Sequence, residues 1–161
     1  MISFTVYGPP KAQARQKITT VNGKPRTYTP KDSADYRTRI RDAATEAMAG
    51  RPLIDSPCCV FIQTVKQAKI NGWNKAEREW LDAGGLYIHD RKPDADNHAK
   101  QHLDALNGVV WVDDARVVSL HVLKLQGREP RATVTVWPLH KLFWTDESIV
   151  KFIQEIQREQ A

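Results

Sequence analysis

Apolar and polar residues alternate at the start of the chain, where Ile2, Phe4 and Val6 are separated by a serine and a threonine. This period of two predicts a half-buried β-strand. The following stretch, residues 8–30, is rich in proline and predicts a long loop, with a small hairpin whose tip lies at residues 21–24.

Apolar residues at helical spacing predict a helix over residues 32–49, with Asp32 or Ser33 as its cap. A β-branched and apolar run at residues 57–65 predicts a second strand. A short helix is expected near residues 74–83, in a basic segment that contains two tryptophans. These tryptophans either pack inward from an amphipathic helix or form an exposed platform for nucleic acid.

The second half of the chain predicts a helix over residues 97–106, with Asp96 as its N-cap. Strands at 117–125 and 132–137 flank a turn, and an antiparallel hairpin is the simplest arrangement for them. Apolar residues between Ile149 and Ile156 predict an amphipathic helix at the C-terminal end. The order of elements predicts an α+β fold with helices packed on a mixed β-sheet.

Length and composition fit one soluble domain that covers residues 1–161, since domains commonly have about 150 residues. The hydrophobic content of 41% and charged content of 27% exclude a disordered or coiled-coil chain. No apolar run approaches the roughly 18 residues of a membrane span, so a cytoplasmic location without membrane association is expected. Cys58 and Cys59 are adjacent and provide no disulfide framework.

The net charge of +5 is unevenly distributed along the chain, and this indicates a candidate binding surface for an anionic partner. Residues 1–31 contain six basic residues and no acidic residue, so they form either a solubilising loop or a phosphate-binding surface. The candidate DNA contacts in this region are Lys11, Arg15, Lys17 and Arg26.

Acidic residues gather further along the chain. Asp94 and Asp96 lie two residues apart on a stretch expected to be extended, so both carboxylates should point the same way at the start of the helix. Lys100 follows one turn later. Such a carboxylate pair fits a hard divalent ion such as Mg²⁺, whereas the alternative is an ordinary cap, a turn residue and an exposed ion pair.

A second acidic pair, Asp113-Asp114, follows a short apolar run. Alone it is typical of a solvated turn. If the chain returns to the helix start, one of the two supplies a third carboxylate, enough to hold two metal ions about 3.5–4 Å apart. His98 and His102 offer a different interpretation, a zinc-binding structural domain, but they lack supporting ligands at suitable spacing.

These motifs carry a resemblance to a known family. The blocks Lys92-Pro-Asp-Ala-Asp-Asn-His-Ala-Lys100, Leu103-Asp-Ala-Leu-Asn107 and Trp111-Val-Asp-Asp-Ala-Arg-Val117 resemble the signature of RusA-type Holliday-junction resolvases. The resemblance implies a RusA-like fold, a homodimer and an endonuclease dependent on Mg²⁺ or, as a substitute, Mn²⁺. It also implies that Asp94, Asp96 and Asp114 are the catalytic metal-binding carboxylates and that Lys100 is the essential basic residue, with Asp113 as a less certain neighbour.

The expected function is therefore a structure-selective DNA endonuclease that resolves four-way junctions by paired symmetric incisions during recombination and repair. The expected partner is branched DNA. The alternatives are a nuclease for another branched DNA and a non-catalytic DNA-binding accessory module. Segments 66–90 and 138–161 look like additions to the compact family core, so the resemblance assigns them no role.

Overall fold

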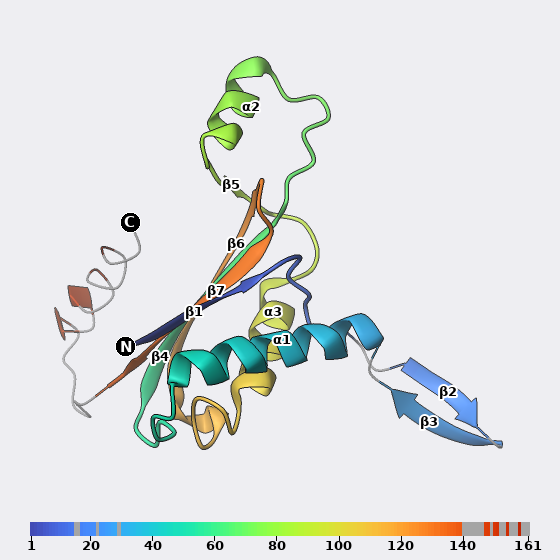
Figure 1. Cartoon of the computed structure of the whole chain (residues 1–161), viewed down its shortest axis with the longest axis vertical. Coiled ribbons are helices and arrows are strands. Elements are labelled where there is room, and N and C mark those ends of the chain that lie inside the picture. The colour runs from blue at the N-terminus through green and yellow to red at the C-terminus, as the bar shows by residue number, and fades with distance from the viewer. Residues whose placement is uncertain are drawn as a thin grey trace.

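The computed structural model describes residues 1–14, 17–21, 23–28, 30–139 and six single positions beyond residue 146. Within these residues the chain forms an α+β domain with a five-stranded mixed sheet, a separate two-stranded hairpin and three α-helices (Figure 1). The α-helices are α1 (Lys31–Met48), α2 (Lys75–Asp82) and α3 (Ala95–Leu106). The strands are β1 (Ile2–Tyr7), β2 (Lys17–Val21), β3 (Lys24–Tyr28), β4 (Cys58–Gln67), β5 (Tyr87–Ile88), β6 (Val117–Gly127) and β7 (Arg131–Pro138).

The main sheet has the order β1-β7-β4-β6-β5, and β4 and β6 are its parallel pair. Helix α3 belongs to the crossover that connects these two parallel strands. Strand β4 lies at the centre because apolar residues occupy both of its faces, and Cys58, Cys59 and Val60 are all fully buried. The crossover therefore delivers the start of α3 beside β6.

The predicted hairpin between strands 117–125 and 132–137 is wrong. Strands β6 and β7 both pair with β4, β6 in parallel and β7 antiparallel, so β4 lies between them. The residues that connect β6 to β7 pass the end of β4, since Gly127 pairs with Gln67 and Arg131 pairs with Val65. A turn signal fixes where the chain reverses, but it does not fix which strand lies beside it.

Helices α1 and α3 pack together on one face of the main sheet and bury the core. Tyr36, Ile40 and Trp111 are completely buried there. Two reciprocal hydrogen bonds join the helices: the Ser33 hydroxyl donates to the side-chain oxygen of Gln101 at 3.2 Å, and the Gln101 amide donates to the Ser33 carbonyl at 2.9 Å. Both residues are buried, so their pairing fixes α3 against α1.

The two helices predicted in the first half of the chain are both observed, but their end residues and caps differ from the prediction. The helix expected at 32–49 is α1, but Pro30 is its N-cap residue and no side chain caps it, so the assignment to Asp32 or Ser33 is wrong. The helix near 74–83 is α2, which Asn74 caps in a capping box with Glu77.

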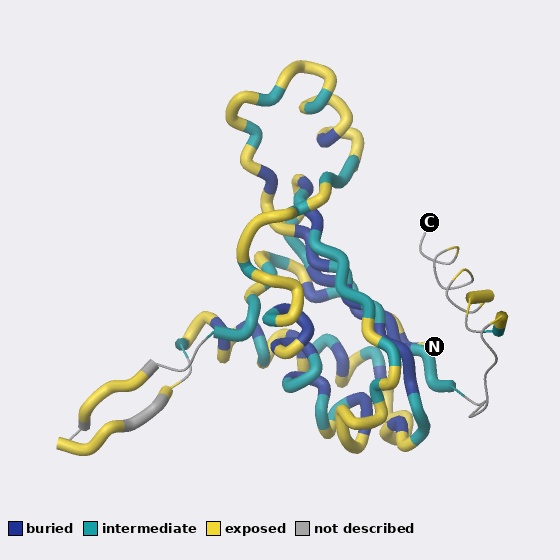
Figure 2. Tube along the Cα trace, turned by 180° about the vertical axis from the view of Figure 1, so that it is seen from behind, coloured by how far each residue is buried: buried dark blue, intermediate teal, exposed yellow. Residues whose placement is uncertain are grey.

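The hairpin tip expected at residues 21–24 joins β2 to β3, as predicted. This hairpin and the segment around α2 both project from the domain, and exposed residues dominate both (Figure 2). Of the helix predicted between Ile149 and Ile156, only positions 150, 151 and 154 are described, and they are helical, while the four apolar residues on which the prediction rests lie outside the described part. The full extent of the domain, 1–161, stays a prediction. No helix in the described part of the chain is long and apolar enough to cross a membrane.

Candidate active site

Helix α3 begins two residues earlier than the sequence predicts, and this changes the acidic pair. Asp94 is the N-cap residue, although its side chain makes no capping bond, and Asp96 lies in the first turn. Because a helix turns about 100° per residue, side chains two positions apart point to different sides. The expectation that both carboxylates point the same way from an extended stretch is therefore wrong, and so is the assignment of Asp96 as the cap.

One face of α3 lines an open groove of about 560 Å³. Asp96, Lys100 and Asp104 follow one another at four-residue spacing along this face, as the sequence indicates. Asp114 enters the same groove from the short 3-10 helix Asp114–Arg116 that precedes β6. The predicted return of the second acidic pair toward the helix is thus observed for Asp114. The remaining lining residues are Ala95, Ala99, Leu103, Leu120 and Val122.

The two neighbouring aspartates have different environments. The Asp113 carboxylate accepts a hydrogen bond from the Ala115 backbone N–H at 2.8 Å and caps the 3-10 helix. Asp114 makes no such bond and faces the groove. The structure therefore places Asp114, and not Asp113, beside Asp96 and Lys100.

The carboxylates of the groove also differ in their ion pairs. Asp104 lies 3.8 Å from the Arg37 guanidinium, and Gln13 donates to it at 3.4 Å. Within the described residues, Asp94, Asp96 and Asp114 form no ion pair. Asp96 and Asp114 therefore bring to the groove negative charge that no ion pair in the described structure neutralises.

The aspartates of the groove supply the type of ligand that a divalent metal prefers, but their spacing in the described part of the chain does not form a complete metal site. Unpaired, exposed carboxylates are the oxygen donors that Mg²⁺ prefers, and Asp96 and Asp114 share one groove. Asp94 is not among the residues that line it. Among the described residues, no group of three His, Cys, Asp or Glu side chains lies close enough together to hold a metal ion. The oxygen donors suit a hard cation, and two of the three predicted ligands, Asp96 and Asp114, line the groove.

Two residues at the site have no signal in the sequence motifs. Gln13 and Arg37 come from the N-terminal loop and from α1, and Arg37 donates to Gln13 at 3.2 Å, so the two form a small network around Asp104. The Gln13 backbone N–H also donates to the Asn97 carbonyl at 2.8 Å. This network attaches the N-terminal loop to the first turns of α3. Only the tertiary fold brings these residues together.

The N-terminal loop leaves β1 at Gly8, which has a positive φ of 91°. A Cβ atom at this position would lie 2.7 Å from Nη1 of Arg39. That guanidinium donates to the Tyr7 carbonyl at 2.7 Å. The backbone conformation favours glycine at this position, whereas the flexible end of the Arg39 side chain could move away from a Cβ atom.

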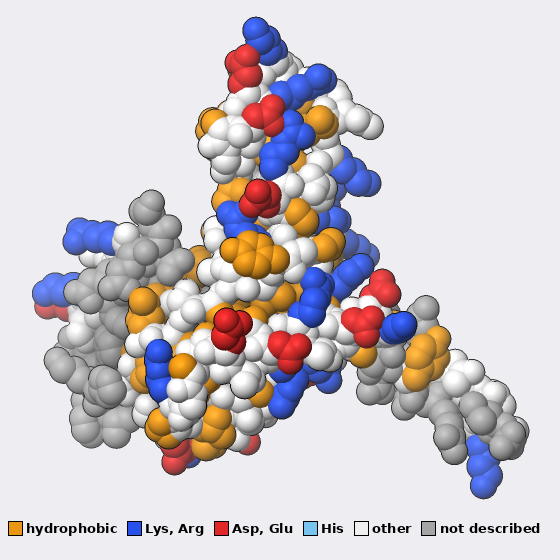
Figure 3. All heavy atoms as spheres, viewed as in Figure 1, with side chains coloured by type: hydrophobic (Ala, Val, Ile, Leu, Met, Phe, Trp, Pro, Cys, Tyr) orange, Lys and Arg blue, Asp and Glu red, His pale blue; other side chains and the backbone are white. Residues whose placement is uncertain are grey.

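The four predicted DNA contacts are only partly described. Lys11 lines a cavity of about 250 Å³ near the start of α3, and its ammonium lies 3.5 Å from Asp32. Lys17 and Arg26 belong to β2 and β3, and their side chains lie outside the described part, as does all of Arg15. Figure 3 shows lysine and arginine side chains on the body of the domain and on the projection that carries α2.

The histidines of α3 serve the core, which argues against the zinc interpretation. Both ring nitrogens of His102 are within hydrogen-bond distance of partners, Nε2 of the Tyr36 hydroxyl at 3.2 Å and Nδ1 of the His98 carbonyl at 2.7 Å. Burial lowers the pKa of each histidine to about 4, and the proximity of His102 adds to the effect on His98. Both rings are therefore neutral at pH 7 and lie in the interior.

Comparison with known proteins agrees with this arrangement. Residues 7–137 match the family model described as Endodeoxyribonuclease RusA, which includes the β1 end, α1, α3 and the groove. The chain is also 33% identical over 137 residues to YqaN of Bacillus subtilis (strain 168), which is described as an uncharacterized protein. The match covers 84% of this chain and 94% of YqaN. The chain belongs to the RusA endodeoxyribonuclease family.

Proposed function

We propose that this protein is an Mg²⁺-dependent endonuclease that resolves four-way DNA junctions, acting as a homodimer that makes paired symmetric incisions. The observation that carries the proposal is the groove in which Asp96, Lys100 and Asp114 meet. A protein that only binds phosphates gains nothing from unpaired carboxylates beside its ligand, because the carboxylates repel the phosphates. A metal-dependent nuclease needs such carboxylates to bind its metal ion.

Asp96 and Asp114, which share the groove, are the residues that would hold the metal, and Asp94 would join them if its carboxylate turned toward the groove. When bound, a divalent ion supplies an activated water and stabilises charge on the phosphate oxygens. Lys100 lies one turn from Asp96 on the same face of α3 and lines the same groove. There it stabilises negative charge on the phosphorane or protonates the leaving oxygen.

The homodimer follows from the reaction. One carboxylate set cuts one strand, whereas resolution requires two strands to be cut at symmetric positions, and a twofold dimer supplies the second set. Strand β6 offers apolar surface for such a contact, because Val118 is 62% exposed and Leu120 is 37% exposed. Leu120 also lines the groove, so an interface here would place the two sites near one another.

The test is incubation of the protein with a labelled four-way junction and a matched duplex, with and without Mg²⁺. We expect cleavage of the junction alone, only with the metal, at paired sites that leave ligatable nicks. Asp96→Asn should bind the junction as well as or better than the wild type but should not cut it, since the change removes negative charge and no cation.

Three results would contradict parts of this proposal. Binding without cleavage in Mg²⁺ or Mn²⁺ would identify an accessory module. Equal or faster cleavage of a flap or a three-way junction would identify a nuclease for another branched DNA. Sedimentation as a monomer, both free and bound to the junction, would refute the dimer.

A further inference from the structure

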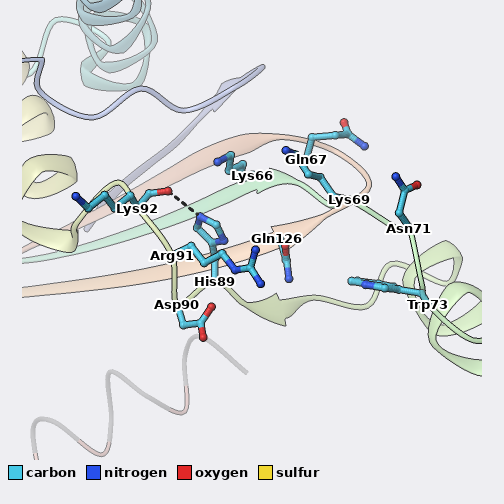
Figure 4. A pocket seen from close by; sticks show the side chains of 10 residues that line it. All are labelled: Lys66, Gln67, Lys69, Asn71, Trp73, His89, Asp90, Arg91, Lys92 and Gln126. Atoms are coloured by element: carbon cyan, nitrogen blue, oxygen red, sulfur yellow. Dashed lines mark hydrogen bonds between the residues drawn. The ribbon is translucent and has the colours of Figure 1, made fainter.

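A second cavity, of about 680 Å³, lies between the end of β4 and the segment that leads into α3. Most of its lining residues belong to segment 66–90, to which the family resemblance assigns no role, and the others are Arg91, Lys92 and Gln126. Its lining contains four cations and a single carboxylate, together with several amide groups and one indole (Figure 4). The cations are Lys66, Lys69, Arg91 and Lys92.

The cationic side chains of this cavity are not neutralised by the protein. None of the four forms an ion pair within the described residues. The lone carboxylate, that of Asp90, is exposed. Lys66 and Lys124 also help to lower the pKa of His89, after the larger effect of burial, which indicates a positive local potential. Such a cavity favours an anionic ligand.

The cavity is built on fixed elements. The backbone of its α3 side is held because Lys124 donates to the Arg91 carbonyl at 2.8 Å, and the His89 N–H donates to the Lys124 carbonyl at 2.9 Å. On its other side, Trp73 packs edge-on against Tyr87, with ring centroids 4.5 Å apart. Lys66 thus stands on strand β4, and Arg91 belongs to a segment whose backbone is hydrogen-bonded to β6.

The rest of the projection is attached to the main sheet. Trp80 packs on Tyr87 at a centroid distance of 4.5 Å, and the Trp80 indole covers Gly85 so closely that a Cβ there would overlap it. Arg128, in the connection between β6 and β7, forms an ion pair with Asp82 at the end of α2. Trp80 is still 47% exposed. The tryptophans thus serve chiefly as packing for α2, and Trp73 also contributes an apolar wall to the cavity.

The position of the cavity indicates which anion it takes. Lys92 lies two residues before Asp94, so the cationic lining is adjacent along the chain to the start of α3, where the candidate active site begins. Lys66 and His89 also line the smaller cavity that contains Lys11 and His98, which places the two cavities side by side. A chain of phosphates could follow this surface toward the carboxylates, whereas a single small anion would occupy only part of it.

We propose that this cavity binds the phosphodiester backbone of the DNA strand that flanks the cleaved phosphate, with Lys66, Lys69 and Arg91 as its phosphate contacts. The proposal rests on the proposed function, because it assigns the polymer to the cavity from the proximity of Lys92 to the carboxylate site along the chain. The indole of Trp73 provides a surface for a sugar or a base.

The first test measures junction binding without divalent metal over a range of NaCl concentrations. Lys69→Gln and Arg91→Gln should each lower the slope of log K against log [NaCl] by about 0.9, the contribution of one duplex phosphate contact, or by about 0.7 if the strand is single. Arg51→Gln is the matched control. This exposed arginine follows the far end of α1 and should leave the slope unchanged.

The second test locates the DNA directly. Cys58 and Cys59 are fully buried, and burial, with Cys59 as a further cause, raises the pKa of the Cys58 thiol to about 11. Asn71→Cys therefore introduces a selectively reactive thiol at the cavity, to which a maleimide photo-crosslinker can be attached. We expect crosslinks to the junction from this position and none from Arg51→Cys.

Unchanged salt slopes for both glutamine variants, or crosslinks equal to those of Arg51→Cys, would overturn the proposal. To separate a phosphate polymer from a free anion, inorganic phosphate is added at constant ionic strength. Displacement of the junction from the wild type at low millimolar phosphate would indicate a site for the small anion and would also overturn it. Neither test requires cleavage, so a wild-type protein that binds DNA but fails to cut it refutes the proposed function and not this site.

Discussion

Asp113 and Asp114 are adjacent in sequence, yet the structure predicts opposite consequences for their removal. Asp113 is committed to a backbone hydrogen bond of 2.8 Å that caps a 3-10 helix, whereas Asp114 faces the groove. Asp113→Ala should therefore reduce stability and leave cleavage nearly intact. Asp114→Asn should abolish cleavage and leave stability nearly intact.

The expected magnitudes follow from these contacts. Loss of a side-chain cap costs about 1 kcal/mol, and the exposure of Asp113 places this cap at the lower end of the range. For a domain of this size, 1 kcal/mol corresponds to a fall in melting temperature of about 2–4 °C. Asp114→Asn keeps the shape of the side chain and breaks no hydrogen bond or ion pair in the described structure, so its melting temperature should change by less than about 1 °C.

Both variants are assayed by thermal unfolding without metal and by single-turnover junction cleavage with Mg²⁺. Asp113→Asn is the matched control, because asparagine also caps helices and should retain most of the stability. The reasoning is refuted if Asp113→Ala loses cleavage while Asp114→Asn cuts at the wild-type rate. That result would show that the carboxylate with the capping bond is the one that acts at the phosphate.

Three further predictions concern charge. Lys100→Ala should decrease the rate of single-turnover cleavage by about 10²–10³-fold, with a smaller loss of affinity. If saturating protein restored the wild-type rate, Lys100 would be only a phosphate contact. Glutamine in place of the basic loop residues Lys11, Arg15 and Lys17 should lower the slope of log K against log [NaCl] for duplex binding by about 0.9 per lost contact. An unchanged slope would indicate a solubilising loop. Because the pKa of His98 and His102 is about 4 when folded and 6.5 ordinarily, the unfolded chain binds more protons below pH 6.5. The free energy of unfolding should then fall by about 2 kcal/mol per ring between pH 7 and pH 5, and equal urea midpoints at the two pH values would contradict this assignment.

The sequence predicts the elements of the fold well where one periodicity dominates. Alternation marks β1, and helical spacing marks α1, because each element buries one face against the core. The order of the strands in the sheet is not predicted in the same way. Strands β6 and β7 both pair with β4 because β4 is buried on both faces, and that burial depends on how the helices pack on the sheet.

The site shows the same division. The four-residue spacing of Asp96, Lys100 and Asp104 is sufficient to place all three on one helix face, and the structure confirms it. The helix start decides where Asp94 points, and a shift of two residues in that start separated it from Asp96. Gln13 and Arg37 reach Asp104 from 91 and 67 positions away, a proximity that no local pattern encodes.

The structure sorts the aspartates of this region by what already neutralises them. Asp104 has Arg37 and Gln13, and Asp113 has a backbone N–H, so both are satisfied within the protein. Asp96 accepts hydrogen bonds from the adjacent Asn97, from its backbone N–H at 2.8 Å and its side-chain amide at 3.3 Å, and the Asp114 carboxylate accepts none in the described structure. Neither carboxylate has a cationic partner among the described residues, and both line the groove. A bound cation would balance these charges and, with Lys100, make the groove attractive to a phosphate. The groove carboxylates that folding leaves without a cation are thus the ones available for chemistry.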